Sequence, residues 1–202
     1  MSFKFIIFFI FFCASTVTIA SDDENELVQL LNNIHTMQAT FKQLTLRAGQ
    51  ETTGYMVLER PGKFRWEVLH PNKQLIIVNG NKFILYDADL EQVTKRKMDY
   101  KKPGNPATLL SGSTETLKQM FRVTKLKKPG NGIWFELKPE NKNNFKWIKM
   151  HFIAGQLCTM YVFDNLGQQS EIHFSNIVLN SKIPQSKFVF VVPPKADVLD
   201  EG

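Results

Sequence analysis

The sequence predicts a mainly β fold, in which one large curved antiparallel sheet carries a few helices. Apolar and polar residues alternate with a period of two over most of the chain after Gly49, which is typical of half-buried strands. Turn signals such as Asn79-Gly80 separate successive segments, and no strand–helix–strand alternation is visible. These patterns favour successive hairpins over a parallel nucleotide-binding sheet. With 43% hydrophobic residues in 202, the chain is also too apolar to be disordered.

The first twenty residues have the pattern of a signal peptide. Lys4 precedes an unbroken apolar run over residues 5–14, and Thr18-Ile19-Ala20 is a small-x-small cleavage site. The apolar run is too short to cross a bilayer as a helix. We therefore expect cleavage after Ala20, export of the mature chain, and a single domain over residues 21–202.

The two cysteines suggest neither a lipid anchor nor a disulfide. Cys13 follows Phe12, whereas lipoprotein processing requires a small residue at that position. After cleavage Cys158 is the one remaining thiol, so no intramolecular disulfide is expected. The fold must then depend on its apolar core.

The first segment of the mature chain is predicted to be an amphipathic helix over residues 26–44. The acidic residues 22–24 suit the N-terminus of such a helix. Its apolar residues recur at steps of three and four, namely Leu27, Leu30, Leu31, Ile34, Met37, Phe41 and Leu44. A helix of this kind can pack on an ordinary core or can also line a ligand cavity, and the pattern alone does not choose.

The predicted strands follow the period-two alternation. Phe64 and Trp66 point to one face of their strand, and Arg65 points to the other. A tight turn at Ala154-Gly155-Gln156 joins two later strands. The strands are expected over residues 56–58, 64–68, 75–78, 82–86, 133–137, 145–153, 157–163, 169–178 and 188–191.

Two short helices are expected to interrupt the strands, over residues 106–112 and 114–121. Pro106 suits the first position of a helix and Gly112 suits its end, while a Ser/Thr cap precedes the second helix. A large sheet tends to curl, and helices that cover its concave face supply the second layer. That layer can be tightly packed or can enclose a cavity.

No catalytic or metal-binding motif is visible. The four histidines are scattered, and the chain has no nucleophile elbow, phosphate-binding loop or dinucleotide glycine fingerprint. His173 and Glu171 share a face of a predicted strand, but an exposed pair is a simpler interpretation than a metal site. We therefore expect no enzymatic activity, no cofactor and no metal.

Basic clusters give the chain a formal net charge of +6. Lys95-Arg96-Lys97, Lys101-Lys102 and residues 125–128 lie in predicted loops of an exported protein, and no recognition helix accompanies them. Nucleic acid is therefore not an expected partner. Solvated loop charge is the simpler interpretation, and attraction to an anionic membrane surface or an acidic partner is the alternative.

One colinear series of short motifs covers essentially the whole mature chain. It begins with the segment from Leu58 to Trp66, which contains the Arg60-Pro61-Gly62 turn followed by Phe64 and Trp66. In this order and spacing the series resembles the periplasmic outer-membrane lipoprotein carrier family. The further motifs are Pro71, Asn79-Gly80, Leu85-Tyr86-Asp87, Gln92-Val93, Pro106-Ala107-x-Leu109-Leu110-x-Gly112, Leu137-x-Pro139, Asp164-x-x-Gly167-Gln168 and Phe188-x-Phe190-x-x-Pro193-Pro194.

The resemblance implies an incomplete antiparallel β-barrel whose concave, apolar face is covered by a helical lid. It implies a periplasmic chaperone that takes lipoproteins from an ATP-driven exporter at the inner membrane and delivers them to an acceptor at the outer membrane. Their acyl chains would occupy the cavity. The expected cavity residues are Phe64, Trp66, Ile84, Leu30, Ile34 and Met37; Ile84 is a departure, because some members have a tryptophan there.

The resemblance also implies a latch for the lid. The arginine of the Arg-Pro turn, Arg60, would hydrogen-bond to the lid segment around Pro106, Leu109 and Leu110 and hold it closed. Phe64 matches a position that the family needs for productive transfer. We expect a monomer, because nothing in the sequence suggests a coiled coil or a pairing edge.

Two other classes of function remain open from the sequence. Relatives with a similar half-barrel act as outer-membrane acceptors or as periplasmic sensing modules that bind lipids or lipoproteins. An acceptor should have a processed lipobox cysteine, and a sensor usually adds a second domain. A lipid-modifying hydrolase would need a nucleophile and a base in the cavity, and the sequence nominates neither.

Overall fold

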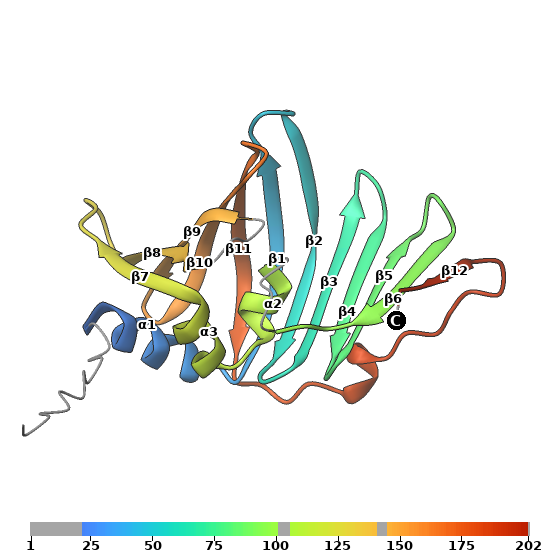
Figure 1. Cartoon of the computed structure of the whole chain (residues 1–202), viewed down its shortest axis with the longest axis horizontal. Helices are drawn as coiled ribbons and strands as arrows, with labels where there is room; N and C mark the ends of the chain where they lie inside the picture. The colour runs from blue at the N-terminus through green and yellow to red at the C-terminus, as the bar shows by residue number, and fades with distance from the viewer. Residues whose placement is uncertain (1–21, 101–105, 141–144, 202) are drawn as a thin grey trace, which may run out of the picture.

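A computed structural model describes residues 22–100, 106–140 and 145–201 of the chain. Within these residues, twelve strands form one sheet in the order β12-β6-β5-β4-β3-β2-β1-β11-β10-β9-β8-β7 (Figure 1). All neighbours are antiparallel except β12 and β6, which run parallel. The strands are β1 (Thr36–Thr45), β2 (Gln50–Glu59), β3 (Lys63–His70), β4 (Gln74–Asn79), β5 (Lys82–Asp87), β6 (Gln92–Lys97), β7 (Phe121–Leu126), β8 (Ile133–Pro139), β9 (Phe145–Ile153), β10 (Gln156–Asp164), β11 (Gln169–Leu179) and β12 (Asp197–Asp200).

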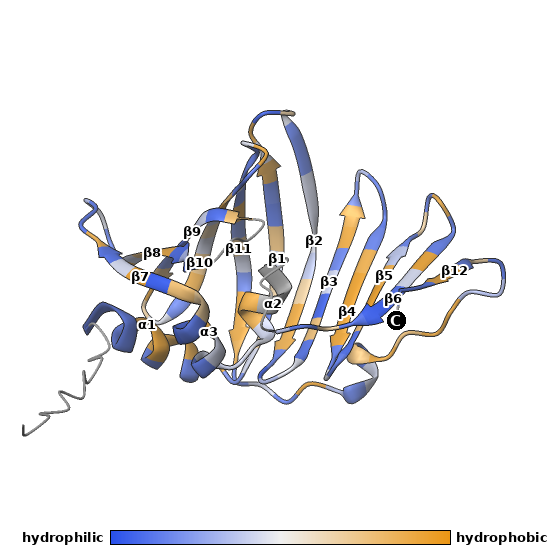
Figure 2. Cartoon of the chain, in the orientation of Figure 1, coloured by the Kyte–Doolittle hydropathy of each residue, from blue (hydrophilic) through white to orange (hydrophobic). Residues whose placement is uncertain are grey.

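The sheet curves but does not close, because β7 and β12 form its two ends. Orange and blue residues alternate along most strands in Figure 2, as expected for a sheet with one face on a core. The hairpin at Asn79-Gly80 joins β4 to β5, and Gly80 has the positive φ of +60° that this tight turn requires. The predicted fold class, a mainly β half-barrel, is therefore confirmed.

Three helices gather on the concave face, beneath β7 and beside the lower ends of β1 to β3 (Figure 1). They are α1 (Asp22–Asn32), α2 (Pro106–Ser111) and α3 (Thr114–Met120). Ser113 caps α3, since its Oγ accepts a hydrogen bond from the Thr116 amide at 3.2 Å. The two predicted short helices are thus confirmed. The helices bury Leu27, Leu31, Leu109, Leu110, Leu117 and Met120 in the main core.

The C-terminal segment crosses the opposite, convex face of the sheet. A 3-10 turn, η1 (Gln185–Phe188), packs on β3 and β4. Phe188 and Ile183 form a small second core with Val57, whose side chain points away from its neighbours Met56 and Leu58 in the main core. The sheet is consequently covered on both faces, by the helices on one and by the C-terminal segment on the other.

The predicted long helix over residues 26–44 is wrong beyond Asn32. Residues 36–45 form β1, a central strand hydrogen-bonded to both β2 and β11. Met37 and Phe41 are four residues apart, a spacing that suits one face of a helix and equally one face of a strand. Ala39 between them is also buried, which fits only the period of two. The helical spacing of apolar residues thus continues to Leu44, although the helix itself ends at Asn32.

The remaining differences lie near the edges of the sheet. The strand expected over residues 188–191 is wrong, because Phe188 ends η1 and the chain that follows forms no strand until Asp197. Strands β6, β7 and β12 were not predicted. The signal peptide and its cleavage site lie outside the described residues. Among the described helices, none has the length and apolarity that crossing a bilayer demands.

Candidate functional site

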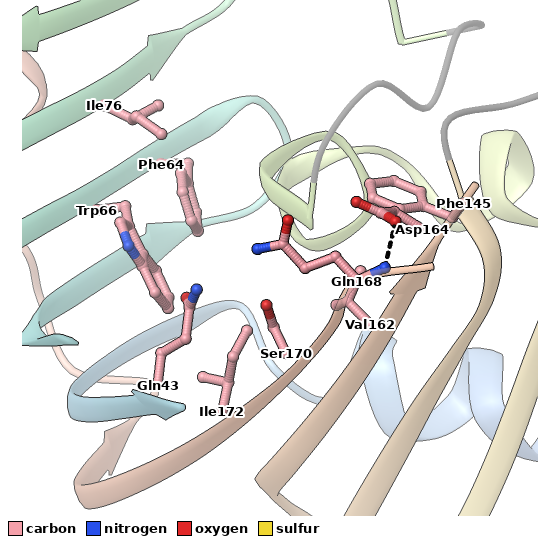
Figure 3. Close-up of a pocket in the computed structure, with 10 residues that line it drawn as sticks. All are labelled: Gln43, Phe64, Trp66, Ile76, Phe145, Val162, Asp164, Gln168, Ser170 and Ile172. Atoms are coloured by element: carbon pink, nitrogen blue, oxygen red, sulfur yellow. Dashed lines mark hydrogen bonds between the residues drawn. The ribbon is translucent and has the colours of Figure 1, made fainter. Parts of the chain in front are cut away.

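An apolar cleft opens on the concave face between the two halves of the sheet. Phe64 and Trp66 of β3 and Ile76 of β4 form one wall, and Val162 of β10 and Ile172 of β11 form the other (Figure 3). Its volume is about 280 Å³, slightly below the range of roughly 300–1,000 Å³ that is common for small-molecule sites. Gln43, Phe145, Asp164, Gln168 and Ser170 complete the lining.

Stacked aromatic rings form the centre of this wall. The rings of Phe41 and Trp66 stack with centroids 3.6 Å apart, and Phe64 and Phe174 lie 6.2 and 6.3 Å from Trp66. Gly54 makes this stack possible, because a Cβ there would lie 2.8 Å from Phe41 Cζ and would collide with the Glu67 carbonyl. The sheet therefore presents flat, rigid apolar surface to the cleft.

A second, more polar cavity of about 200 Å³ continues the cleft along β3 and β4. It shares Gln43, Trp66 and Ile76 with the first cavity. Its other lining residues are Gln50, Thr52, Val68, Pro71, Asn72 and Gln74, most of which are polar. The groove as a whole thus changes from apolar near Phe64 to polar at its far end, which suits an elongated amphiphile.

The polar groups of the first cavity are partly occupied by a turn. Asp164 accepts hydrogen bonds from the amides of Leu166 and Gln168 at 2.9 and 2.8 Å, which fixes the β10–β11 connection. The dashed line in Figure 3 marks the Gln168 bond, and the Gln168 side chain points toward the middle of the cleft. Asp164 is therefore a structural carboxylate at the rim of the cleft.

The β2–β3 turn connects the cleft to the helices. The Gly62 amide donates a hydrogen bond of 2.7 Å to the Ser111 carbonyl at the end of α2, and Gly62 has a positive φ of +87°. Arg60 Nη2 donates to the Gly112 carbonyl at 2.8 Å, and Nη1 makes a weaker contact of 3.4 Å to the Leu31 carbonyl at the end of α1. One guanidinium thus joins both helix ends to the sheet.

Burial acts on the charge of Arg60. Desolvation of the partly buried guanidinium lowers its pKa from 12.5 to about 10, and the nearby Glu115 acts in the opposite direction. The group remains protonated at neutral pH. Its hydrogen bonds to carbonyl oxygens are therefore charge-assisted.

The structure brings most of the predicted lid residues together. Leu109 and Leu110 are buried in the same main core as Phe64, and Pro106 is the first residue of α2. The Arg60 side chain contacts the carbonyl of Gly112, just after α2. Among the predicted cavity residues, Phe64 and Trp66 line the cleft.

The other predicted cavity residues lie elsewhere. Ile34 and Met37 are 3% and 1% exposed and pack in the core with Leu30 at their margin, outside the cleft lining. Ile84 was wrongly assigned to the concave face. Its neighbour Phe83 points into the main core, so the alternation along β5 turns Ile84 toward the convex face.

Sequence reasoning missed the second wall of the cleft. Val162 and Ile172 belong to strands that were predicted, but the chain pattern does not say which face of β10 and β11 opposes β3. The partial signal was the alternation that sets Ile172 and Phe174 on one face. Their meeting with Trp66 depends on the pairing of β1 with β11, more than 120 residues apart in sequence.

The described residues contain no cluster of three or more histidine, cysteine, aspartate or glutamate side chains that could hold a metal ion. His173 Nε2 lies 2.6 Å from Glu171 Oε1, and the same oxygen accepts from Tyr161 Oη at 2.7 Å. This partly exposed group is therefore a hydrogen-bonded set on the convex face, away from the cleft.

Comparison with known proteins adds independent information. Residues 32–191 match the family described as outer membrane lipoprotein carrier protein LolA. The outer-membrane lipoprotein carrier protein of Pseudomonas paraeruginosa is 40% identical over 197 residues, covering 93% of this chain and 94% of the relative. The protein of the same name from Coxiella burnetii is 38% identical over 199 residues, covering 96% and 94%.

A solved structure supports the fold alone. An uncharacterized conserved protein from Thermus thermophilus superposes with a TM-score of 0.55 at 12% sequence identity. The match covers 88% of this chain and 97% of the other, so the likeness extends over nearly the whole half-barrel.

Proposed function

This chain belongs to the family of outer-membrane lipoprotein carrier proteins, and from that premise we propose how it holds and releases its cargo. It is a periplasmic chaperone for lipoproteins. The acyl chains of the lipoprotein enter the cleft between Phe64, Trp66 and Ile76 on one side and Val162 and Ile172 on the other. The observation that carries this proposal is an apolar cleft beside helices whose ends are joined to the β2–β3 turn by Arg60 and by the Gly62 amide.

Burial of the acyl chains supplies the binding energy. Each buried methylene contributes about 0.8 kcal/mol, so exposing a 16-carbon chain to water costs on the order of 12 kcal/mol. The cleft of the empty protein, at about 280 Å³, is small for such cargo. Cargo entry therefore moves α2 away from the sheet, and the space under Leu109 and Leu110 becomes part of the binding site.

Arg60 acts as the latch in this proposal. A charged hydrogen bond contributes roughly 1.5–3 kcal/mol, far less than burial of an acyl chain. Cargo can therefore displace the bond to Gly112, while the empty protein stays closed. A latch of this strength keeps the aromatic wall away from water without making release prohibitively slow.

The partners follow from the same proposal. An ATP-driven exporter at the inner membrane loads the carrier, and an acceptor at the outer membrane unloads it. The signal peptide is removed after Ala20. The carrier catalyses no covalent step, because transfer requires only that the acyl chains move from one apolar site to another.

The test is formation of a soluble complex. Purified mature protein is mixed with vesicles that contain a triacylated lipoprotein, the exporter and ATP, and the supernatant is assayed for an equimolar complex. We expect an ATP-dependent complex that Phe64→Glu weakens strongly, because a carboxylate would be buried in the apolar wall. Leu90→Glu is the matched control, since Leu90 is 70% exposed on a distant turn.

The outcomes separate the carrier from the alternatives. Equal loading of the wild type and the Phe64 variant would refute the assignment of the cleft. If no lipoprotein complex forms and phospholipid is bound instead, the protein is an acceptor-like or sensing module for lipids. Release of free fatty acid from an acyl ester by the pure protein would indicate a hydrolase.

A further inference from the structure

The convex face carries a separate cavity, remote from the cleft, with a concentration of positive charge. It lies where the ends of β5 and β6 meet the C-terminal segment, and its volume is about 450 Å³. We propose that this cavity binds the phosphate headgroup of an anionic phospholipid at a membrane surface. It is lined by Asn81, Lys82, Phe83, Ile84, Lys95, Arg96, Lys97, Phe190, Val192 and Asp200.

Strand register brings the charges together. Lys82 of β5 is directly opposite Lys97 of β6, and Ile84 is directly opposite Lys95. Paired residues in an antiparallel ladder point to the same side, as do residues two apart along one strand. Three ammonium groups therefore project from one small patch of the convex face. Like charges directly opposite each other are unfavourable in a sheet, unless a counter-charge joins them.

The described residues supply little of that counter-charge. Arg96 is not one of these cations: it is directly opposite Phe83 and points to the concave face, with its guanidinium carbon 4.2 Å from the Phe83 ring centroid. Asp200, in register with Lys95, is the single carboxylate in the lining. Three lysines face one carboxylate, whereas the salt bridges of the described residues elsewhere join lysine and arginine to nearby acids such as Glu59 and Glu136.

The apolar part of the cavity favours a lipid over a free anion. Phe190 and Val192 of the C-terminal segment and Ile84 of β5 form one side, and Phe190 lies 5.4 Å from Tyr86, ring to ring. An anionic headgroup with adjoining glycerol and methylene groups matches a basic rim next to an apolar wall. A free phosphate would make no use of that wall. Basic side chains near an anionic leaflet add attraction for each charge.

This site would have a role in the transport cycle that the cleft cannot have. A carrier with the cleft on one face and a headgroup site on the other can rest on a membrane while the cleft stays free for cargo. The inference thus extends the proposed function, but it does not depend on cargo binding. Its test uses empty protein and vesicles without lipoprotein or exporter, so its failure would leave the loading experiment unaffected.

The experiment is co-sedimentation of the mature protein with vesicles of pure phosphatidylcholine or of phosphatidylcholine with phosphatidylglycerol. We expect binding only to the anionic vesicles. The triple variant Lys82→Gln, Lys95→Gln, Lys97→Gln should lose on the order of a hundredfold in affinity, about fivefold for each lysine. The matched control replaces Lys73, Lys127 and Lys182 by glutamine, which removes the same net charge at scattered exposed positions.

Three results would overturn the proposal. Equal weakening by the two triple variants would mean that net charge alone draws the protein to the vesicles. No binding to anionic vesicles by folded wild-type protein would remove the site altogether. Saturable binding of inorganic phosphate, lost in the Lys82 triple variant but unaffected by Phe190→Ser, would identify a free-anion site. A headgroup site requires instead that Phe190→Ser weakens vesicle binding while phosphate alone binds negligibly.

Discussion

Replacing Arg60 by leucine should shift the empty protein toward an open form. The change removes the 2.8 Å charge-assisted bond to the Gly112 carbonyl and the 3.4 Å contact to the Leu31 carbonyl. Only the shorter contact has good hydrogen-bond geometry, so we assign the latch the energy of one charged bond, roughly 1.5–3 kcal/mol. That energy corresponds to a factor of about 10 to 150 in the equilibrium between open and closed forms. An open population of about 1% would then rise to between roughly one tenth and three fifths.

Fluorescence of Trp66 reports this shift, because the ring lines the cleft and belongs to β3, one of the strands on which α2 packs. With Trp134 and Trp147 replaced by phenylalanine, Trp66 is the one tryptophan left in the chain. We expect acrylamide to quench it more strongly in Arg60→Leu than in the parent. Arg60→Lys should lie between the two, since it keeps the charge but loses the planar fork that reaches two carbonyls.

The control is Arg122→Leu, which removes an equivalent charge from an exposed pair with Glu140. It should leave the quenching unchanged. Equal quenching of Trp66 in the parent, Arg60→Leu and Arg122→Leu, with all three proteins folded by circular dichroism, would refute the latch. Loss of cooperative unfolding in Arg60→Leu would instead assign Arg60 a role in folding. The quenching of Trp66 in Arg60→Lys then tests whether the closed form requires the planar guanidinium.

Two further predictions concern stability. Gly54→Val should reduce the free energy of unfolding by about 1–3 kcal/mol in urea denaturation, because the new side chain meets Phe41 and the Glu67 carbonyl; unchanged stability would mean that the aromatic stack is not tightly constrained there. Burial first, and then the bond to the Glu171 carboxylate, raise the pKa of Tyr161 from 10 to about 12. Its contribution to stability is therefore complete below pH 10 and is lost as the pH rises toward 12, so Tyr161→Phe should flatten the alkaline loss of stability between these values. Parallel pH profiles for the two proteins would contradict this.

Much of the sheet could be predicted because its signals are local. Alternation along β3 placed Phe64 and Trp66 on one face, and Asn79-Gly80 fixed the β4–β5 hairpin, since each signal spans only a few residues. Resemblance to a family then joined Arg60 to the segment near Gly112, 52 residues away, a contact that no local pattern contains.

The wrong predictions arose where a local pattern fits both a helix and a strand, or where the pairing of strands distant in sequence determines the structure. The spacing of Met37 and Phe41 fits a helix and a strand, and the pairing of β1 on both sides settles the choice. Ile84 was assigned from a position in the family rather than from its own alternation with Phe83. The second cleft wall depends on β10 and β11, and their approach to β3 follows from the curvature of the whole sheet.

The two ends of the open sheet affect the tendency of this protein to aggregate at high concentration. An unpaired strand edge invites another chain to add to it, and a half-barrel has two such edges. At one end, Asp23 of α1 accepts a hydrogen bond of 2.9 Å from the Lys125 amide of β7. This backbone amide is therefore not free to pair with a strand of another chain. At the other end, β12 is only four residues long, and exposed aspartates stand at both its ends, Asp197 and Asp200. Charge and shortness deter strand addition there. The same openness that admits a bulky cargo is thus compatible with colloidal stability, because each edge is protected by a different local device.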